Sequence, residues 1–319
     1  MTYVIIHALA PIFVIMLLGF YAGKAGMVDN KNVVTLNIFV MDFALPAALF
    51  GATVQTPWQG IIAQSPLIVV LALTMWATYA AIYFISTRYF HKSPQDAAVL
   101  TLTVALPNYA ALGLPILGSV LGPGPATSLS VAASIACGSV LMTPFCLLIL
   151  EREKARAAGH SQHGGIGMLP LLMWRSVTKP IVWGPLLGVV LSGVQLKMPD
   201  LVLAAIHPLG LSATAAALFL TGVILSARKL KLSRIVVISS LTTMLIEPFI
   251  AWGLVLLFGL HGRVAVTGIL MIALSAGFFG VVFGNRFGVY SPDAEATLLI
   301  SSLLCIITLP LFITLTAGL

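Results

Sequence analysis

Ten apolar stretches, each about long enough to cross a lipid bilayer, occupy almost the whole of this 319-residue chain. Charged residues make up only 8% of the sequence, whereas a soluble domain carries roughly 25%. So few charges cannot cover a surface that faces water, and most of the surface must therefore face lipid. Backbone polar groups in lipid are satisfied only in helices or closed barrels, and the stretches lack the alternation of barrel strands. The sequence therefore predicts an all-α polytopic membrane protein.

The predicted protein has ten transmembrane helices joined mostly by short loops, which leaves no room for a soluble domain within these residues. About 20 residues of helix span the hydrocarbon core. The stretches lie at 3–22, 33–54, 62–86, 97–119, 126–149, 178–195, 201–226, 233–258, 264–285 and 293–317.

The net charge of +7 is distributed unevenly along the chain. Odd-numbered loops contain 14 of the 16 Lys and Arg residues, and the even loops contain only Lys197 and Arg263. Basic residues near helix ends stay in the cytoplasm during insertion. We therefore expect odd loops in the cytoplasm and both termini outside, in a bacterial inner membrane. Charges arranged in this way argue against nucleic-acid binding.

The one longer loop, at 150–177, divides the chain into halves of five stretches, 1–149 and 178–319. A short pattern in the first stretch recurs in the sixth. Its matching residues are all separated by the same number of positions, the separation of Pro11 from Pro180, which is here called the repeat offset. The matching residues are Pro11-Ile12 with Pro180-Ile181 and Leu17-Leu18-Gly19 with Leu186-Leu187-Gly188. Because five spans reverse the direction of the chain, the second half must enter from the opposite face. The halves are predicted to form an inverted repeat, a common architecture of secondary transporters.

The fourth and ninth stretches each contain residues that interrupt a helix near its middle. Pro107 removes a backbone donor and clashes with the preceding turn, and the polar residues Asn108 and Tyr109 follow it. Gly277 and Gly280 weaken the ninth helix at the matching depth. Two interrupted helices at equivalent positions predict a transport site between them. The alternative is that these prolines and glycines only kink or pack single helices.

An interrupted helix is suited to binding an anion. The start of its second half presents backbone N–H donors and the positive end of the helix dipole. No Lys or Arg lies in the middle of any stretch, so a site there would rely on such donors. The predicted substrate-binding residues at the breaks are Asn108, Tyr109, Ser275, Gly277, Phe278, Phe279 and Gly280, and those from the opposing helices are Asn37, Asp42, Thr214 and Thr221.

Four segments, taken in order, resemble the auxin efflux carrier family of membrane transporters. They are Ala44-Leu45-Pro46-Ala47-Ala48-Leu49-Phe50, Asn108 followed by Gly113-Leu114-Pro115, the pattern after Pro180, and Asn285-Arg286-Phe287-Gly288-Val289-Tyr290. The resemblance extends over nearly the whole chain. It implies crossed, broken helices four and nine that contact the substrate, and an elevator-like motion. It also implies a scaffold of helices one, two, six and seven and a homodimer formed through that scaffold.

Within the family the chain looks most like the bacterial malonate carriers, which makes a small dicarboxylate the expected substrate. The sequence departs from the family pattern at two places. The family often has proline at the ninth-helix break, where this chain has Ser275 or Ala276, and often another proline in helix seven, which is lacking here from Leu211 to Ser226. These departures leave the shape of the second break open.

Three charged residues have candidate roles in transport. Asp42 and Glu247 are the two acidic residues in mid-span, where a charge is costly and needs a partner, water or a cavity. Desolvation favours the protonated form of a carboxyl group. We therefore expect one of the two to bind a coupling proton or sodium ion, the alternative being a structural hydrogen bond. Arg286 lies near the cytoplasmic end of the ninth stretch, where it either meets substrate leaving the site or anchors the helix.

These features together predict a secondary active transporter of small organic anions, with malonate uptake coupled to a proton or sodium ion. The alternative is an efflux carrier or channel for another carboxylate such as oxalate, succinate or an auxin-like acid. The sequence lacks the Asp cluster, Ser–His pair or HExxH motif of an intramembrane enzyme. Its three cysteines, all within the stretches, have no metal-ligand spacing. We expect no enzymatic activity, no metal and no cofactor.

Overall fold

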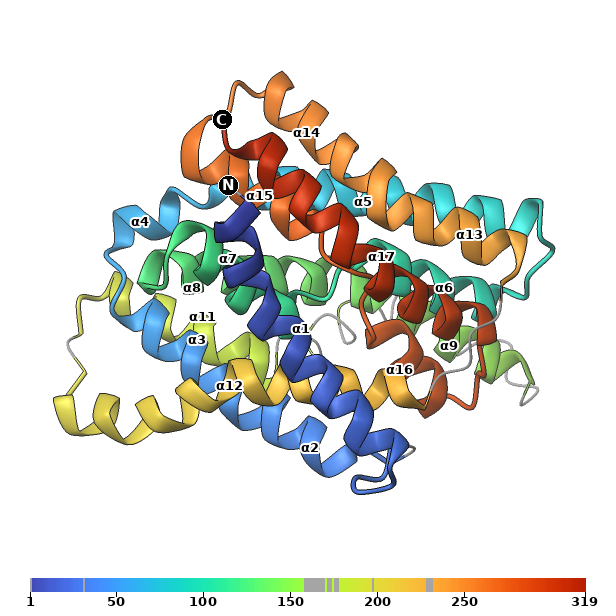
Figure 1. Ribbon diagram of the computed structural model, residues 1–319, viewed down its shortest axis with the longest axis horizontal. Coiled ribbons are helices and arrows are strands. Elements are labelled where there is room, and N and C mark those ends of the chain that lie inside the picture. Colours follow the sequence, from blue (N-terminus) through green and yellow to red (C-terminus); the bar gives the residue numbers. More distant parts are fainter. Residues whose placement is uncertain are drawn as a thin grey trace.

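The computed structural model describes residues 2–30, 32–157, 170, 174, 178–196, 198–227 and 232–319, and most of these are helical. Most of the predicted connecting loop, 150–177, lies outside the described residues; the exceptions are 150–157, which end the helix α9, and the single positions 170 and 174. The side chains of Thr214 and Arg286, two predicted site residues, are also outside them. Figure 1 shows the arrangement of the helices.

Each of the ten predicted stretches is helical over most of its described length. The helices of the first half are α1 (Thr2–Lys24), α2 (Val34–Ile38), α3 (Leu45–Val54), α4 (Trp58–Ile62), α5 (Ser65–Arg88), α6 (Pro94–Ala105), α7 (Leu114–Leu121), α8 (Pro125–Cys137) and α9 (Thr143–Ala157). Those of the second half are α11 (Pro180–Gly193), α12 (Asp200–Ser226), α13 (Arg234–Leu241), α14 (Glu247–Leu257), α15 (Gly262–Ile272), α16 (Phe279–Arg286) and α17 (Pro292–Thr316). Four π-helical turns join some of them: η1 (Phe39–Ala44), η2 (Tyr109–Gly113), η3 (Gly138–Met142) and η5 (Thr242–Ile246).

Six helical segments among the described residues are long and apolar enough to cross a membrane, and four shorter apolar helices accompany them. Large apolar side chains also lie on the outside of the molecule: Leu201, Leu257 and Ile307 are 81%, 74% and 72% exposed. Water does not favour such a surface, but hydrocarbon does. The chain is therefore a polytopic membrane protein.

The π-helical turns share a sequence cause. Each of the four ends shortly before a proline, namely Pro46, Pro115, Pro144 or Pro248. Proline lacks an N–H and clashes with the carbonyl of the preceding turn. A wider π-helical turn, which is common at functional sites, accommodates the ring without ending the helix. Three of these helices therefore stay continuous, and only the one that also contains Pro107 is broken.

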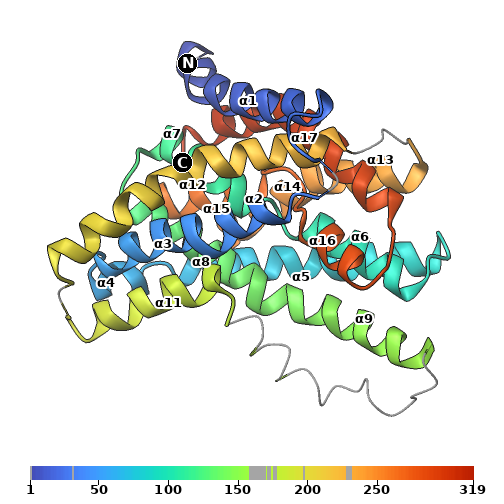
Figure 2. The ribbon, with the colours of Figure 1, turned by 90° about the horizontal axis from the view of Figure 1, so that it is seen from below.

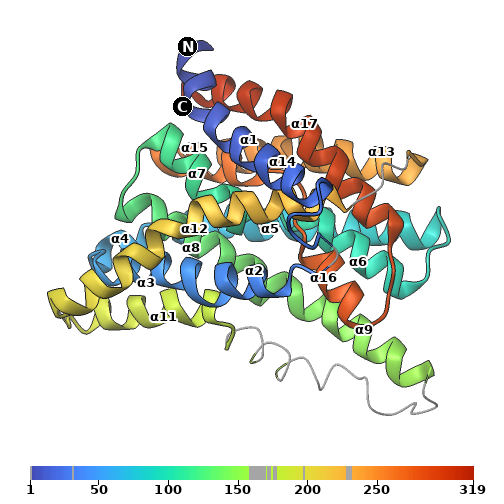
Figure 3. The same ribbon diagram turned by 60° about the horizontal axis from the view of Figure 1, so that its bottom comes forward.

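The helices form two groups. The first, here called the panel, consists of α1, α2–α3, α11 and α12, where α1 packs along α12 and α3 packs against both α11 and α12. The second, here called the bundle, contains α5 to α9 and α13 to α17. In Figure 1, α2, α3, α11 and α12 of the panel lie in the lower half and α5, α13, α14 and α17 of the bundle in the upper half. Figure 3 shows α2, α3, α11 and α12 lying side by side from another direction.

Contacts between loops divide the loops into the same two sets as the charges do. Lys92 pairs with Asp293, Ser233 donates to Asp293 at 2.9 Å, and Asn30 donates to Ser226 at 2.8 Å, so residues of loops one, three, seven and nine meet at one end. At the other end, Arg263 donates to the carbonyl of Leu121, which joins loops eight and four. Figure 2 shows the turns gathered at these two ends. In the part of the chain that the structure describes, odd loops one, three, seven and nine thus meet at one end, and even loops four and eight meet at the other.

Glycines allow the panel helices to touch at backbone distance. A Cβ on Gly19 of α1 would overlap the carbonyl of Phe219 in α12, and one on Gly222 would overlap the carbonyl of Met16. Gly188 of α11 approaches α3 in the same way, close to the carbonyl of Phe50. Small residues permit this close packing where hydrophobic exclusion does not drive helices together. The recurring Leu-Leu-Gly pattern is thereby explained, because both of its glycines lie at helix–helix contacts.

Replacing Gly222 with Ala should therefore separate α1 from α12 and destabilise the panel. Overpacking of this kind costs about 1–3 kcal/mol, which should lower the thermal unfolding temperature of the purified protein in detergent. Gly253→Ala is the matched control, because a Cβ there meets nothing within 4 Å and helix propensity favours Ala. Equal unfolding temperatures for Gly222→Ala and the wild type would contradict the packing assigned to α1 and α12.

Candidate functional site

Two broken helices meet in the interior of the bundle. Helix α6 ends at Ala105 and η2 begins at Tyr109, while α15 ends at Ile272 and α16 begins at Phe279. Pro107 and Ala276, in the two breaks, form an antiparallel bridge. These breaks lie in the stretches in which the sequence predicts them, and we call the place where they meet the crossing.

The first break follows directly from Pro107. Leu106, the residue before it, adopts an extended conformation (φ −117°, ψ 93°), as expected for a residue that precedes proline. The backbone N–H of Asn108 then donates to the carbonyl of Ser275 at 2.9 Å. The N–H of Asn108, which the break releases, is thus satisfied by the second broken stretch.

The second break forms without a proline. The N–H of Gly277 donates to the carbonyl of Thr103 at 3.0 Å, and the N–H of Ala276 donates to the hydroxyl of Ser301 at 3.1 Å. Gly277 and Gly280 have no Cβ, and one at either position would overlap a carbonyl of Leu106 or Val99. Close approach and tertiary hydrogen bonds therefore hold this break open, which resolves the point left open by the departure from the family pattern.

Polar side chains at the crossing are buried without partners. Asn108 is 2% exposed, and among the described residues neither its Oδ1 nor its Nδ2 has a hydrogen-bond partner. The hydroxyl of Ser275, also buried, has none either. An unsatisfied buried polar group costs about 1–3 kcal/mol. Atoms of this kind are suited to a polar ligand that enters between the two helices.

Aromatic rings line the start of α16. Phe278 and Phe279 stack with ring centroids 4.9 Å apart, and Phe279 stacks on Phe283 at 6.1 Å. The ammonium of Lys179, at the start of α11, lies 4.3 Å from the centroid of Phe283. This contact joins the panel to the bundle on the odd-loop side of the crossing. Tyr109, buried on the other broken helix, points its hydroxyl to the sulfur of Met75 at 3.6 Å.

The remaining predicted residues differ in their burial and in their hydrogen-bond partners. Asn37 is half-buried on α2, and its Oδ1 has no partner among the described residues. The hydroxyl of Thr221 is already bonded to the carbonyl of Ala217, within its own helix. Asp42 in η1 is exposed, whereas Glu247 is fully buried. The two carboxyl groups that the sequence places in mid-span therefore lie in opposite environments.

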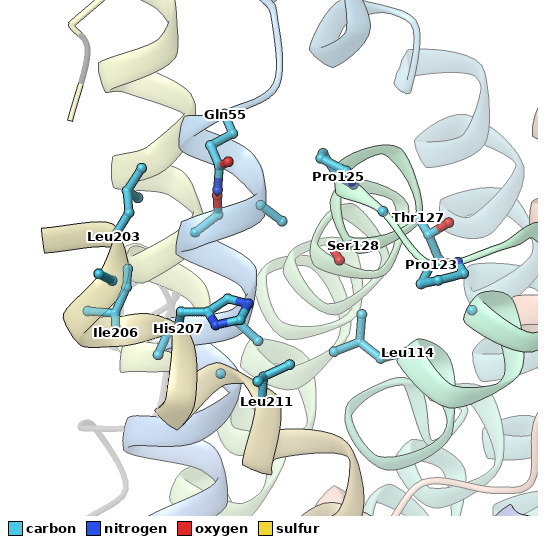
Figure 4. A pocket seen from close by; sticks show the side chains of 18 residues that line it. Gln55, Leu114, Pro123, Pro125, Thr127, Ser128, Leu203, Ile206, His207 and Leu211 are labelled. Carbon is cyan, nitrogen blue, oxygen red and sulfur yellow. The ribbon is translucent and has the colours of Figure 1, made fainter. Parts of the chain in front are cut away.

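A groove of about 710 Å³ separates the panel from the bundle on the even-loop side. Gln55, which follows α3, and His207 of α12 face Leu114 of α7 and Thr127 and Ser128 of α8 across it (Figure 4). None of the predicted site residues whose side chains are described lines it. Sequence reasoning missed this groove because no motif marks a space formed between two groups of helices. The small residues of α3, Ala47, Ala48, Gly51 and Ala52, are the one signal for it.

The groove approaches the crossing without entering it. Leu114 in its wall lies about 9 Å beyond Asn108 when the rise of a helix is followed along the chain. Beside Ser275 there is a cavity of only about 10 Å³, roughly the space of one water molecule. The described structure is therefore open toward the even loops and closed around the crossing itself.

Ionic contacts close the odd-loop end of the bundle. Lys92 bonds to Asp96 at 2.8 Å and to Asp293, which also accepts a hydrogen bond from Ser233. Burial lowers the pKa of Lys92, but the bonds to Asp293 and Asp96 outweigh this effect and raise the pKa above its ordinary value of 10.5. The ammonium group thus stays charged at neutral pH and ties α6, α13 and α17 together.

Comparison with known proteins agrees with this geometry. The family model described as "Membrane transport protein" matches residues 4–313. "Uncharacterized transporter YfdV" of Escherichia coli (strain K12) is 26% identical over 305 residues, which cover 96% of this chain and 95% of that protein. "Putative malonate transporter" of Rhizobium meliloti (strain 1021) is 23% identical over 313 residues, with coverage of 93% and 91%. This chain is a transporter rather than an enzyme, and it belongs to the auxin efflux carrier family of membrane transport proteins.

Proposed function

We propose that the protein is a secondary active transporter that takes up small organic anions, with malonate as the leading candidate. The observation that carries the proposal is the pair of unpartnered buried groups, Asn108 and Ser275, at the crossing. The second halves of both broken helices, η2–α7 and α16, begin there. Helix starts attract anions through free N–H groups and the helix dipole, and no Lys or Arg lies in mid-span to do so instead.

We further propose that residues 1–149 and 178–319 form a 5+5 inverted repeat of ten spans about an axis through the crossing. Equivalences at the repeat offset, that from Pro11 to Pro180, support it. Helix α5 and the segment α13–α14 begin and end at positions related by this offset. The same offset relates Pro107 to Ala276, Gly19 to Gly188, and Phe50 to Phe219. Two copies of one unit, inserted in opposite directions, would produce these equivalences.

Alternating access then arises from motion of the bundle against the panel, as in an elevator. The groove separates the two groups on the even-loop side, and Lys179 on Phe283 joins them on the odd-loop side. A groove on one side and a contact on the other suit a conformation in which the site is accessible from the even-loop side. The 14 basic residues of the odd loops support their location in the cytoplasm. Both termini would lie in the periplasm, and Arg286 would meet the substrate on leaving. The panel would form the homodimer interface.

The substrate is proposed from two observations. The crossing is small and lacks a formal positive charge among the described residues, which suits a compact carboxylate held by dipoles. A relative is named as a malonate transporter. An efflux carrier or channel for oxalate, succinate or an auxin-like acid is the alternative. Saturable uptake with counterflow of malonate in proteoliposomes supports the carrier, and unitary currents support a channel.

Asn108→Ala should weaken malonate binding by about tenfold or more, since one hydrogen bond to a charged ligand is worth about 1.5–3 kcal/mol. Binding is measured by isothermal titration on the purified protein, with thermal unfolding as the test of folding. Asn32→Ala, on an exposed residue of the first loop, is the control and should bind as the wild type does. Unchanged affinity in Asn108→Ala would place the substrate elsewhere.

Gly118→Trp should block the route from the even-loop side. A Cβ at Gly118 meets nothing within 4 Å, and the residue lines the groove, so an indole there fills the groove without unfolding the protein. We expect loss of malonate uptake, measured with labelled malonate in right-side-out vesicles. Gly253→Trp, on an exposed glycine of α14, should transport normally. Uptake by Gly118→Trp at the wild-type rate would exclude the groove as the entry path.

Single cysteines test the proposed orientation. Leu196→Cys in an even loop should react with a membrane-impermeant maleimide in intact cells, and Leu232→Cys in an odd loop should react only after permeabilisation. Both leucines are exposed, at 54% and 70%, whereas Cys137, Cys146 and Cys305 are buried and serve as an internal background. The reverse pattern of labelling would invert the proposed topology.

A further inference from the structure

Glu247 lies near the middle of its apolar helical segment and inside the bundle. It begins α14, and it stands between Arg234, where α13 starts, and Leu257, where α14 ends. At about 1.5 Å of rise per residue, these two ends lie about 20 Å and about 15 Å from it along the helix. Its side chain is fully buried, whereas the side chain of Asp42, the other acidic residue in mid-span, is exposed.

The carboxyl group has no charged partner among the described residues. Neither of its oxygens makes a hydrogen bond of normal geometry to any of them. The hydroxyl of Thr78 on α5 interacts with Glu247 across the packed helices. Thr78 and Glu247 are themselves related by the repeat offset, so they occupy equivalent positions in the two halves.

The titratable groups on the elements around Glu247 do not neutralise it. Helix α5 carries Tyr79, Tyr83 and Arg88, η2 carries Tyr109, and α15 carries Arg263. Helix α17, which packs against η5, carries Asp293 and Glu295 in its first turn and the buried Cys305. Both arginines lie at the ends of their helices, and Arg88 is about 15 Å beyond Thr78 along α5. Tyr109 is the one close enough to interact electrostatically with Glu247. An ionised carboxylate without a cation at this depth costs many kcal/mol, whereas the protonated group does not.

A proton fits this place better than a sodium ion does. Alkali and alkaline-earth cations are held by several oxygen atoms at once. The described side chain that interacts with Glu247 through a hydroxyl is Thr78, whereas the hydroxyl of Tyr109 donates to the sulfur of Met75 at 3.6 Å. No group of three His, Cys, Asp or Glu side chains able to hold a metal ion occurs among the described residues. The surroundings thus stabilise a neutral carboxylic acid rather than an ion pair.

Tyr109 connects this group to the crossing. It follows Asn108 directly and lies within electrostatic reach of Glu247. A negative charge on Glu247 would oppose an anion held at the crossing, and protonation removes that opposition. By linkage, the anion must in turn favour the protonated group to the same degree. The π-helical turn η5 and Pro248 flank Glu247, and such turns often mark functional positions.

We propose that Glu247 is the proton-binding residue that couples anion uptake to the proton gradient, which rests on the transport function proposed above. The carboxylate takes a proton from water on the even-loop side and forms an O–H bond. After the bundle has moved, that bond breaks and the proton passes to water on the odd-loop side. One proton offsets one of the two negative charges of a malonate dianion, so each malonate taken up with one proton still carries one net negative charge across the membrane. Asp42, exposed on the panel, has no part in this step.

The experiment compares Glu247→Gln with Asp200→Asn, on an exposed residue at the start of α12, in proteoliposomes that contain a pH-sensitive dye. In the wild type and in Asp200→Asn, an inward malonate gradient should acidify the lumen. Glu247→Gln imitates the protonated group, so it should keep malonate counterflow but acidify the lumen about tenfold less, a change of about 1.4 kcal/mol in coupling. Acidification by Glu247→Gln at the wild-type rate, or wild-type uptake driven by sodium alone, would overturn the proposal.

A second measurement does not depend on transport. Infrared spectra of the wild type at neutral pH should contain the C=O stretching band of a buried carboxylic acid, and Glu247→Gln should lack it. Absence of this band from the wild type overturns the proposal even if the variant misfolds. If the band is present but the wild type does not move malonate, the proposed substrate fails while the protonated Glu247 stands.

Discussion

The satisfaction of backbone hydrogen bonds inside the membrane is the constraint on which the rest of the structure depends. A helix broken in hydrocarbon releases N–H and C=O groups that no water can satisfy. Here each broken helix supplies a partner to the other. The backbone N–H of Asn108 donates to the carbonyl of Ser275, and the backbone N–H of Gly277 donates to the carbonyl of Thr103. Neither break would be stable alone, so the two helices must cross at this point. The crossing is thereby fixed before any ligand arrives.

The same constraint explains why the site is polar without carrying charge. The backbone groups used in the bridge between Pro107 and Ala276 leave the side chains of Asn108 and Ser275 free. Close approach of the helices requires Gly277 and Gly280, which have no side chains to fill the space. The outcome is a compact set of donors and acceptors in the middle of the bundle. The larger groove lies on one side of it, between bundle and panel.

Much of this arrangement was predictable from local sequence. The apolar stretches indicated the helices, Pro107 indicated the first break, and the repeat offset from Pro11 to Pro180 located its counterpart near Gly277. The second break was harder to define, because it depends on Thr103 and Ser301, which are distant in sequence. The opposite burial of Asp42 and Glu247 could not be predicted either. Helices that are apolar on every side give no periodic signal for the face that turns inward. The groove arises between helices far apart in the chain, and so lacks a local signature.

An experimental structure of the protein saturated with malonate tests the central claim most directly. The account predicts a carboxylate between Asn108 and the start of α16, with the side chains of Asn108 and Ser275 hydrogen-bonded to it. Malonate bound only in the groove, with Asn108 and Ser275 still unpartnered at saturation, would contradict the account.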